Sequence, residues 1–342
     1  MSSIILDYDL PPQRIAQFPA RQRDRSRLLV FDRTSGAILH KRFHHLDQFL
    51  KPGDCLVINQ TKVFPARLYG EKKDTGGKVE ILLLKKVKGE IWESLMRPAQ
   101  RVKINTQIRF PGQTVEATVL SERPQGIKVI SFSKDKQAKN WIKKIGRVPL
   151  PPYIRRAARS LDQERYQTVY AKNYGSVAAP TAGLHFTRPL LRKLKMKGIH
   201  IVPLTLHIGL GTFQPIRSQN PEIHKPHPEN YEIPLISAQQ INQLKKNGNR
   251  IIAVGTSTVR ALESAWDGKN VSPLKNSTDL FIHPPYSFNV IDGLITNFHL
   301  PHSTLLLLVA AFIREQKLLD LYQIAIKKKY RFYSYGDAMF II

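Results

Sequence analysis

His185 is the first residue in this sequence whose surroundings suggest chemistry. It lies in the uncharged stretch 175–186, among Gly, Ala, Pro and Thr residues. Gly and Pro at this density favour tightly packed turns, where the backbone can approach a ligand closely and an imidazole can move a proton. A buried histidine that only satisfies a backbone carbonyl would have the same sequence, so both interpretations stay open.

His207 follows an apolar run and precedes two closely spaced glycines. Gly209 and Gly211 resemble the start of a dinucleotide-binding fingerprint, but Gln214 stands where its third glycine would be required. The pattern therefore indicates neither a nicotinamide nor a flavin site. His207 remains a candidate acid or base.

A second loop combines imidazoles with a carboxylate. It contains His224, His227 and Glu229, separated by Pro226 and Pro228. The prolines prevent the helical presentation usual for closely spaced zinc ligands, and the loop offers no third strong ligand, so a zinc site is disfavoured. General acid–base chemistry by His227 and Glu229 fits these residue types better.

Small polar residues begin a predicted helix directly after the strand-like run 250–254. Thr256 and Ser257 would present hydroxyls and free backbone N–H groups to an anion, with Arg260 one turn further on. Because no P-loop lysine accompanies them, we expect the carboxylate of an amino-acid-like ligand rather than a nucleoside triphosphate. An ordinary hydroxyl cap of the helix is the alternative.

Aromatic, amide and imidazole side chains follow two further apolar runs. Tyr286 follows the first run, and Asn297, Phe298 and His299 follow the second. Aromatic faces are suited to stacking on a purine. Open α/β folds bind ligands at the ends of their strands, so these positions favour a site over packing alone.

The C-terminal half alternates predicted helices with predicted strands. Helices are expected over 187–198, 237–248, 258–266 and 303–316, and strands over 199–206, 250–254, 280–282 and 294–295. Thr187 is expected to cap the first helix, and Ser237 with Gln240 has the spacing of a capping box. Such alternation builds a sheet covered by helices on both faces, which predicts a three-layer α/β unit. The first sixty residues have the same strand character and are assigned to it.

Residues 61–149 differ from the rest of the chain in their sequence pattern. Short β-rich runs alternate with Gly- and Pro-containing turns, as in a small antiparallel barrel or sandwich: 64–69, 78–84, 91–96, 107–110, 115–120 and 127–132. The segment has 20 Lys and Arg against eight Asp and Glu, which suits either a phosphate backbone or a merely solvated surface. We predict a β-barrel domain over 61–149, inserted between residues 1–60 and 150–342.

The overall charge points to a polyanionic partner. The 342 residues include 53 Lys and Arg against 26 Asp and Glu, for a formal charge of +27. The apolar run 305–313 is far shorter than the roughly 20 residues that span a bilayer, so we expect no membrane association. Cys55 has no second cysteine to pair with, and the N-terminus lacks a signal-peptide pattern. We therefore expect a cytoplasmic monomer.

Longer motifs occur in order along nearly the whole chain. They are LPP (10–12), RDRSRLL (23–29), NQTKV (59–63), YQTVYA (166–171), AAPTAGLHF (178–186), GTF (211–213), TNFHLP (296–301) and YRFYSYGDAM (330–339). Together they resemble the S-adenosylmethionine:tRNA ribosyltransferase-isomerases of queuosine biosynthesis. The resemblance implies transfer and isomerisation of the ribosyl moiety of S-adenosylmethionine onto 7-aminomethyl-7-deazaguanine at the tRNA wobble position. Epoxyqueuosine would form, with release of adenine and methionine. A Rossmann-like domain with an inserted β-barrel, and no metal, are also implied.

The implied reaction gives the candidate residues roles. A sulfonium acidifies the adjacent ribose C–H, so a base can begin the rearrangement, and an acid must help adenine leave. His207, His227 and Glu229 are the candidates for these steps, and Asp279 or Glu229 would pair with the aminomethyl group. Substrate contacts are expected from His185, Thr256, Ser257, Arg260, Tyr286, Asn297, Phe298 and His299.

Three positions depart from the family pattern, and two other function classes stay open. Pro226, Pro285 and His302 replace the usual Met, Gly and basic residue, from which we expect altered loop stiffness rather than lost activity. A tRNA methyltransferase using the same co-substrate would leave S-adenosylhomocysteine. A non-catalytic RNA-binding module would bind without turnover.

Overall fold

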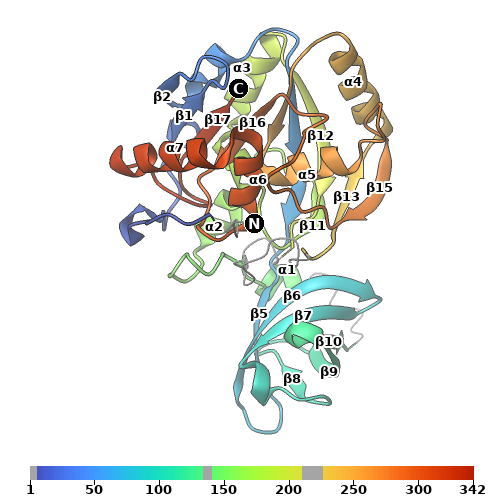
Figure 1. Cartoon of the computed structure of the whole chain (residues 1–342). Coiled ribbons are helices and arrows are strands. Elements are labelled where there is room, and N and C mark those ends of the chain that lie inside the picture. Colours follow the sequence, from blue (N-terminus) through green and yellow to red (C-terminus); the bar gives the residue numbers. More distant parts are fainter. Residues whose placement is uncertain (1–5, 134–140, 210–225) are drawn as a thin grey trace.

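A large mixed sheet with helices on both faces and a smaller β-barrel make up the structure (Figure 1). This computed structural model describes residues 6–133, 141–209 and 226–342. The predicted α/β fold with an antiparallel barrel is confirmed. No helix within these ranges combines the length and the apolar character needed to cross a bilayer.

The large sheet is mixed rather than wholly parallel. Its order is β15 (Leu274–Thr278), β13 (Glu229–Ile233), β12 (His200–Leu206), β3 (Cys55–Asn59), β14 (Ile251–Val254), β16 (Gly293–Asn297), β17 (Ala338–Ile341), β1 (Arg27–Phe31) and β2 (Ile38–Arg42). The four central strands β12, β3, β14 and β16 are parallel to one another. Antiparallel pairing begins at β13 on one side and at β17 on the other. The carboxyl ends of the central strands therefore meet the first residues of β13, β17 and β1 at one edge of the sheet.

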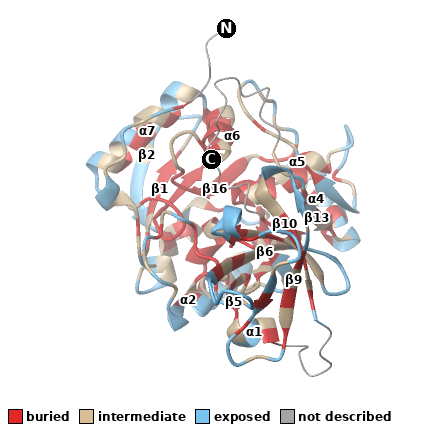
Figure 2. Cartoon of the chain, turned by 90° about the horizontal axis from the view of Figure 1, so that it is seen from below, coloured by how far each residue is buried: buried red, intermediate tan, exposed pale blue. Residues whose placement is uncertain are grey.

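Two apolar cores cover the two faces of this sheet. Side chains alternate along each strand, so Leu28 and Val30 face one core while Leu29 and Phe31 face the other. The smaller core is closed by α3 (Arg188–Met196) and the 3-10 helix η3 (Phe43–Phe49). The larger core is closed by α4 (Leu235–Lys246), α5 (Thr256–Ser264), α6 (Thr304–Ile313) and α7 (Glu315–Lys327). Figure 2 shows the buried central strands, and the helices on both faces of the sheet confirm the three predicted layers.

Several predicted elements differ in detail. The capping box at Ser237 is wrong, because α4 begins after Pro234 and the Ser237 hydroxyl donates to the Pro203 carbonyl at 2.7 Å. The apolar helix expected over 303–316 is broken at Arg314, whose φ of 72° separates α6 from α7. Residues 280–282 form no strand. The Thr187 cap is confirmed, since its hydroxyl accepts from the Leu190 N–H at 3.3 Å.

The barrel closes through six antiparallel strands, and the β-rich runs of the sequence account for all of them. Their order is β10 (Ile127–Phe132), β7 (Ile91–Arg97), β6 (Lys78–Lys88), β5 (Arg67–Lys72), β8 (Gln107–Arg109) and β9 (Glu116–Arg123). Phe110, Phe132 and Trp141 pack together in its core. The domain bounds 61 and 149 remain a prediction.

Short elements connect the two parts. A parallel pair, β4 (Thr61–Val63) with β11 (Asn173–Ser176), lies between them. The remaining helices are α1 (Trp141–Ile145), α2 (Ser160–Arg165), η1 (Pro12–Arg14), η2 (Arg23–Arg25), η4 (Ala99–Arg101), η5 (Pro124–Gly126) and η6 (Thr181–His185).

Candidate active site

Three adjoining cavities meet at Glu229, at the edge where the central strands end. The largest is a cleft of about 930 Å³ that residues of the barrel and of the α/β unit line together. Two narrower cavities run from Glu229 toward the start of α5 and toward α6. Ligands of open α/β sheets bind at this edge, so the combined space is the candidate active site.

The start of α5 provides the predicted anion-binding groups. Gly255 precedes the helix with a φ of 91°, a conformation that side-chain-bearing residues rarely adopt, and its N–H donates to the Ile295 carbonyl at 2.8 Å. Thr256 and Ser257 line the cavity. The Ser257 hydroxyl is oriented by Asn59, whose Nδ2 donates to it at 3.2 Å.

Arg260 lies one turn further along α5 and is engaged by the protein itself. Its Nη1 pairs with Glu229, its Nε donates to the Leu280 carbonyl at 2.9 Å, and its Nη2 donates to the Thr278 carbonyl at 3.2 Å. These contacts leave Thr256 and Ser257 as the better-placed groups for a ligand carboxylate. Arg260 instead fixes the Glu229 carboxylate.

Glu229 and the two histidines near it are brought together as expected. Glu229 is 5% exposed, and its Oε1 accepts from the Gly209 N–H at 2.8 Å. His227 and His207 line the large cleft beside it. Burial, followed by the charge of Lys275, lowers the pKa of His207 below its usual value, which favours the neutral imidazole.

Close packing holds the His207 ring in place. Its Nδ1 lies 2.8 Å from the Thr61 hydroxyl. On the other side the ring packs against Gly175, where an added Cβ would stand only 2.7 Å from the His207 ring. A residue with a side chain at position 175 would therefore displace the imidazole.

Asn297 and His299 also line the cavity at the start of α5. Asn297 is buried; its Nδ2 donates to His185 Nε2 at 3.2 Å, whereas its Oδ1 has no partner among the described residues. His299 Nε2 lies 2.7 Å from the Thr296 hydroxyl, and burial lowers the His299 pKa to about 3. A buried acceptor without a hydrogen bond, such as Asn297 Oδ1, destabilises the protein unless a ligand donates a hydrogen bond to it.

His185 lies behind Asn297 and does not line this cavity. Its Nδ1 is 2.7 Å from the Ser26 hydroxyl, and burial lowers its pKa to about 3. Because Nε2 accepts from Asn297, the proton of the neutral ring is on Nδ1 and is donated to Ser26. These contacts support a structural role for His185.

Three other expected residues lie away from the cavities. Phe298 is fully buried among Tyr322, Tyr330 and Phe332, so its face has no room for adenine. Tyr286 packs against Phe288, outside the cavities that meet at Glu229. Asp279 is exposed just after the edge strand β15. His224 and Gly211 lie outside the described residues.

Two groups of site residues were not among the sequence candidates. Asn59 is fully buried at the end of β3, and besides Ser257 it holds the Leu206 backbone at both Oδ1 and Nδ2. A polar residue ending a buried strand was the available signal. Aromatic rings of the barrel side, including Trp92 and Trp141, line the cleft together with Tyr174, and no sequence pattern connected these distant positions. Within the described ranges, no group of three His, Cys, Asp or Glu side chains could hold a metal ion.

Comparisons with known proteins agree with the motifs of the sequence. The chain matches the family described as "Queuosine biosynthesis protein" over residues 5–341. Proteins named S-adenosylmethionine:tRNA ribosyltransferase-isomerase from Acetivibrio thermocellus and Carboxydothermus hydrogenoformans are 48% and 49% identical, each over 98% of both chains. The crystal structure of an S-adenosylmethionine tRNA ribosyltransferase from Thermotoga maritima covers all of both chains at 36% identity, with a TM-score of 0.56. The resemblance found in the sequence is thus confirmed: this chain belongs to the queuosine biosynthesis protein family.

Proposed function

We propose that this protein transfers and isomerises the ribosyl moiety of S-adenosylmethionine onto 7-aminomethyl-7-deazaguanine at the wobble position of tRNA. Epoxyqueuosine, adenine and methionine are the products. The observation that supports this proposal best is that Glu229 borders both the cavity at the start of α5 and the cleft that aromatic rings line. A small charged co-substrate and a nucleobase can therefore meet at one carboxylate.

The methionine part of the co-substrate fits the cavity at the start of α5. Its carboxylate would accept hydrogen bonds from the Thr256 and Ser257 backbone and hydroxyls, where the helix dipole favours negative charge. Its ammonium would donate to Asn297 Oδ1, the buried acceptor that lacks a partner among the described residues. The two ends of the amino acid thus have complementary partners at the start of α5, which follows β14, and at the end of the neighbouring strand β16.

Side chains at the site can stabilise the charges and transfer the protons of the proposed reaction. Glu229 faces the cavities as a carboxylate paired with Arg260 and can stabilise the positive sulfonium. The neutral imidazole of His207 is suited to remove the acidified ribose proton, and His227 is the candidate acid for departing adenine. We propose a scheme without a metal, because these side chains supply both the charge stabilisation and the proton transfers.

The modified base of the tRNA would enter the large cleft. Phe64 and Trp92 contact each other there, with ring centroids 5.6 Å apart and ring planes tilted by 41°, and Tyr174 lines the same cleft. The buried Trp92 Nε1 has no partner among the described residues, so a base acceptor could satisfy it. Aromatic faces of this kind bind unstacked bases of single-stranded RNA.

The decisive test combines tRNA bearing 7-aminomethyl-7-deazaguanine with labelled S-adenosylmethionine. We expect adenine and methionine to be released in proportion to the modified tRNA. Formation of S-adenosylhomocysteine would instead identify a methyltransferase, and binding without either product would identify an RNA-binding module.

Variants at Glu229 and His207 test the chemistry. Glu229→Gln and His207→Asn should each lower turnover by roughly 100-fold or more, the usual range for loss of an acid–base group. Glu232→Gln is the matched control, since Glu232 is on the same strand β13 but forms its ion pair with Lys275 of the outer strand β15. Urea unfolding of each variant separates lost chemistry from lost fold, because Glu229→Gln leaves Arg260 without its carboxylate.

A further inference from the structure

A second large cavity lies further along the same edge of the sheet. It has a volume of about 630 Å³ and is bordered by the first residues of β1 and the turn before β17, with Arg42 from the end of β2. The candidate active site lies at the ends of β12, β3, β14 and β16, and this second cavity lies at β17 and β1. The two sites therefore adjoin where β16 pairs with β17. With strands spaced by about 4.8 Å, this cavity at β1 is on the order of 10 Å from the end of β16 and on the order of 25 Å from the end of β12, where the large cleft lies.

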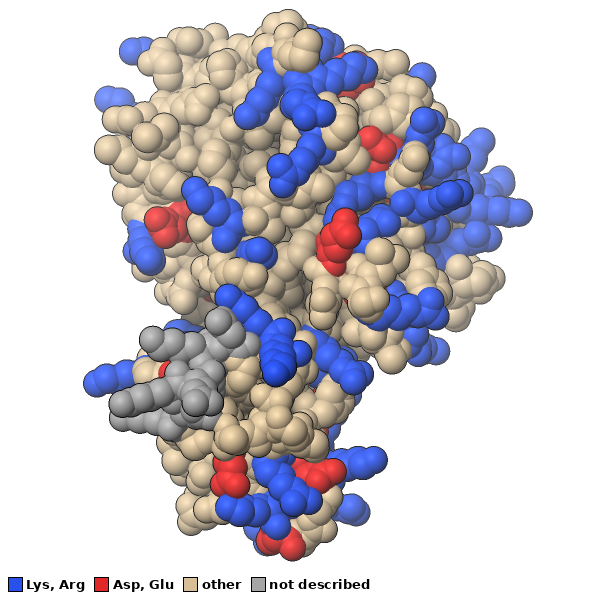
Figure 3. Space-filling view, turned by 180° about the vertical axis from the view of Figure 1, so that it is seen from behind, with Lys and Arg blue, Asp and Glu red and all other residues tan. Residues whose placement is uncertain are grey.

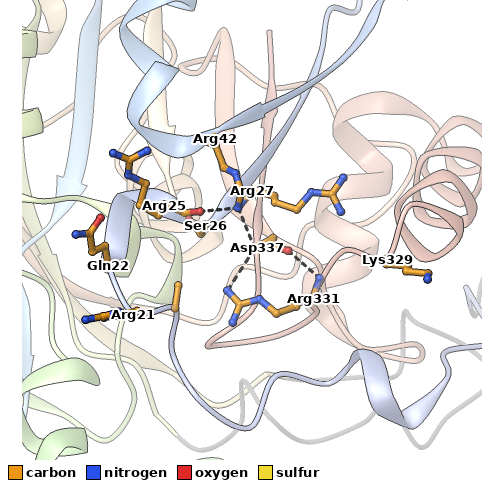
Figure 4. A pocket seen from close by; sticks show the side chains of 10 residues that line it. Arg21, Gln22, Arg25, Ser26, Arg27, Arg42, Lys329, Arg331 and Asp337 are labelled. Atoms are coloured by element: carbon orange, nitrogen blue, oxygen red, sulfur yellow. Dashed lines mark hydrogen bonds and ion pairs between the residues drawn. The ribbon is translucent and has the colours of Figure 1, made fainter.

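The lining of this cavity is strongly cationic. Its six basic residues are Arg21, Arg25, Arg27, Arg42, Lys329 and Arg331, and Asp337 is its single carboxylate. Figure 4 shows these side chains disposed around Asp337. Seen from behind, Lys and Arg side chains crowd one flank of the α/β unit, on the side where Figure 1 draws β1, β2 and α7 (Figure 3).

Asp337 offsets only one of the six positive charges, and it forms an ion pair with Arg331. Oδ1 accepts from the Arg27 N–H at 2.9 Å, and Oδ2 accepts from the Arg331 N–H at 2.8 Å. The Arg331 guanidinium is 3.3 Å from Oδ1. Asp337 thus ties together the two chain segments that form the cavity wall.

Three of the cations are exposed and available to a ligand. No hydrogen bond or ion pair within the described ranges engages the side chains of Arg21, Arg25 or Lys329. Like charges held close together repel one another, so a cluster of this kind is destabilising without a counter-charge. Planar guanidinium groups match the geometry of phosphate oxygens.

A short buried path joins this cavity to the candidate active site. Ser26 lines the cationic cavity, and its hydroxyl is 2.7 Å from His185 Nδ1. Asn297 lines the active-site cavity and donates to His185 Nε2 at 3.2 Å. A single imidazole therefore separates the cationic cavity from the cavity at the start of α5. Both this cavity and the large cleft border Glu229, so a strand with one base in the cleft can reach the cations a few nucleotides further along its backbone.

We propose that this cavity binds backbone phosphates of the tRNA close to the nucleotide that is modified. The proposal rests on the proposed function, because it takes tRNA as the ligand. Phosphate contacts of this type position a nucleic acid without reading its sequence. They would hold the tRNA while its base is in the aromatic cleft.

The test removes two of the available cations. The double variant Arg21→Gln/Arg25→Gln should keep the fold, because neither arginine side chain bonds to any part of the chain that the structure describes. The matched control Lys195→Gln/Lys246→Gln loses the same charge at the ends of α3 and α4, which lead to the opposite edge of the sheet. Both proteins are compared with the wild type in tRNA binding over a range of salt concentrations and in adenine release.

We expect the arginine variant to bind tRNA on the order of tenfold more weakly at about 0.1 M salt, with convergence toward the wild type near 1 M. Its plot of log affinity against log salt should be shallower by about 1.4 to 1.8, the contribution of two phosphate contacts. The KM for S-adenosylmethionine should not change. The control should keep the wild-type affinity and slope.

Two results would overturn the proposal. In the first, the arginine variant binds tRNA as tightly as the wild type does, and the wild type releases adenine. This result contradicts the phosphate site and leaves the proposed function intact. The other is calorimetric binding of inorganic phosphate that the variant loses while its tRNA affinity is unchanged, which marks a site for small anions. If instead the wild type binds tRNA through these arginines but releases no adenine, the proposed function fails and the phosphate site stands.

Discussion

At the scale of single residues, hydrogen-bond partners separate structural histidines from chemical ones. His185 has partners on both ring nitrogens and lies behind the cavity wall, whereas His207 borders the open cleft. Both stand next to small residues in the sequence, so their surroundings along the chain could not distinguish them.

The pKa values of His185 and His299 predict an acid-sensitive fold. Each is lowered from 6.5 to about 3, so the folded protein keeps these rings neutral while the unfolded chain protonates them below about pH 6.5. Stability is therefore full above pH 6.5 and falls as the pH drops toward 3, by up to about 1.4 kcal/mol per pH unit for each histidine. Urea unfolding between about pH 7.5 and about pH 5.5 should show a loss of roughly 3 kcal/mol.

The His185→Gln variant provides the control for this prediction. It should show a smaller pH dependence, because the contribution of His185 is lost while His299 and His207 still gain protons on unfolding. An unfolding free energy that stays constant across this range in the wild type would contradict the assignment of neutral, buried rings.

Alternation along an extended chain explains which site residues the sequence could predict. Asn297 and Phe298 were both expected at the site, but neighbouring side chains of an extended strand point to opposite faces. Asn297 consequently lines the cavity, while Phe298 enters the aromatic core. Asp279 was misplaced for another reason, since the sequence did not show that β15 would be an outer strand.

At the scale of elements, the start of α5 combines an unusual backbone with the proposed carboxylate site. Gly255→Ala should destabilise the protein by about 1–3 kcal/mol, because φ 91° with ψ 151° is a conformation that only glycine adopts easily. Tilting of the first helical turn should also raise the KM for S-adenosylmethionine. Steady-state kinetics and urea unfolding measure the two effects.

Gly248→Ala is the matched control for this change. Gly248 also has a positive φ, of 77°, but follows α4 at the far edge of the sheet with open space around its Cα. It should lose stability without a change in KM. An unchanged KM in Gly255→Ala would show that the start of α5 does not hold the co-substrate.

Elements with strong local signals were predictable, and long-range pairings were not. The barrel strands follow from β-rich runs bounded by turn residues, and α3 follows from its Thr187 cap. The position of β17 between β16 and β1 depends on pairing with β1, about 310 residues earlier in the chain, and such a pairing leaves no local pattern. The same holds for the cleft that joins barrel and α/β residues.

At the scale of the whole molecule, that cleft predicts separate sites for the two substrates. Trp92→Ala should lower kcat/KM for tRNA by roughly 5- to 100-fold, since base–aromatic stacking contributes about 1–3 kcal/mol per base. The KM for S-adenosylmethionine should be unaffected, because Trp92 lines the cleft but not the cavity at α5. Trp92→Phe keeps an aromatic face and should restore most of the activity, whereas equal loss in both variants would argue for a structural role.

The position of β17 also has a consequence for how the protein is made. Residues 338–341 lie inside the sheet, so β1 and β2, although synthesised early, have no neighbour to join until the ribosome has read almost to residue 342. Arg331 and Asp337 arrive equally late, and with them the wall of the cationic cavity. A chain that is synthesised only as far as β16 therefore lacks part of the cavity that we propose to bind tRNA phosphates.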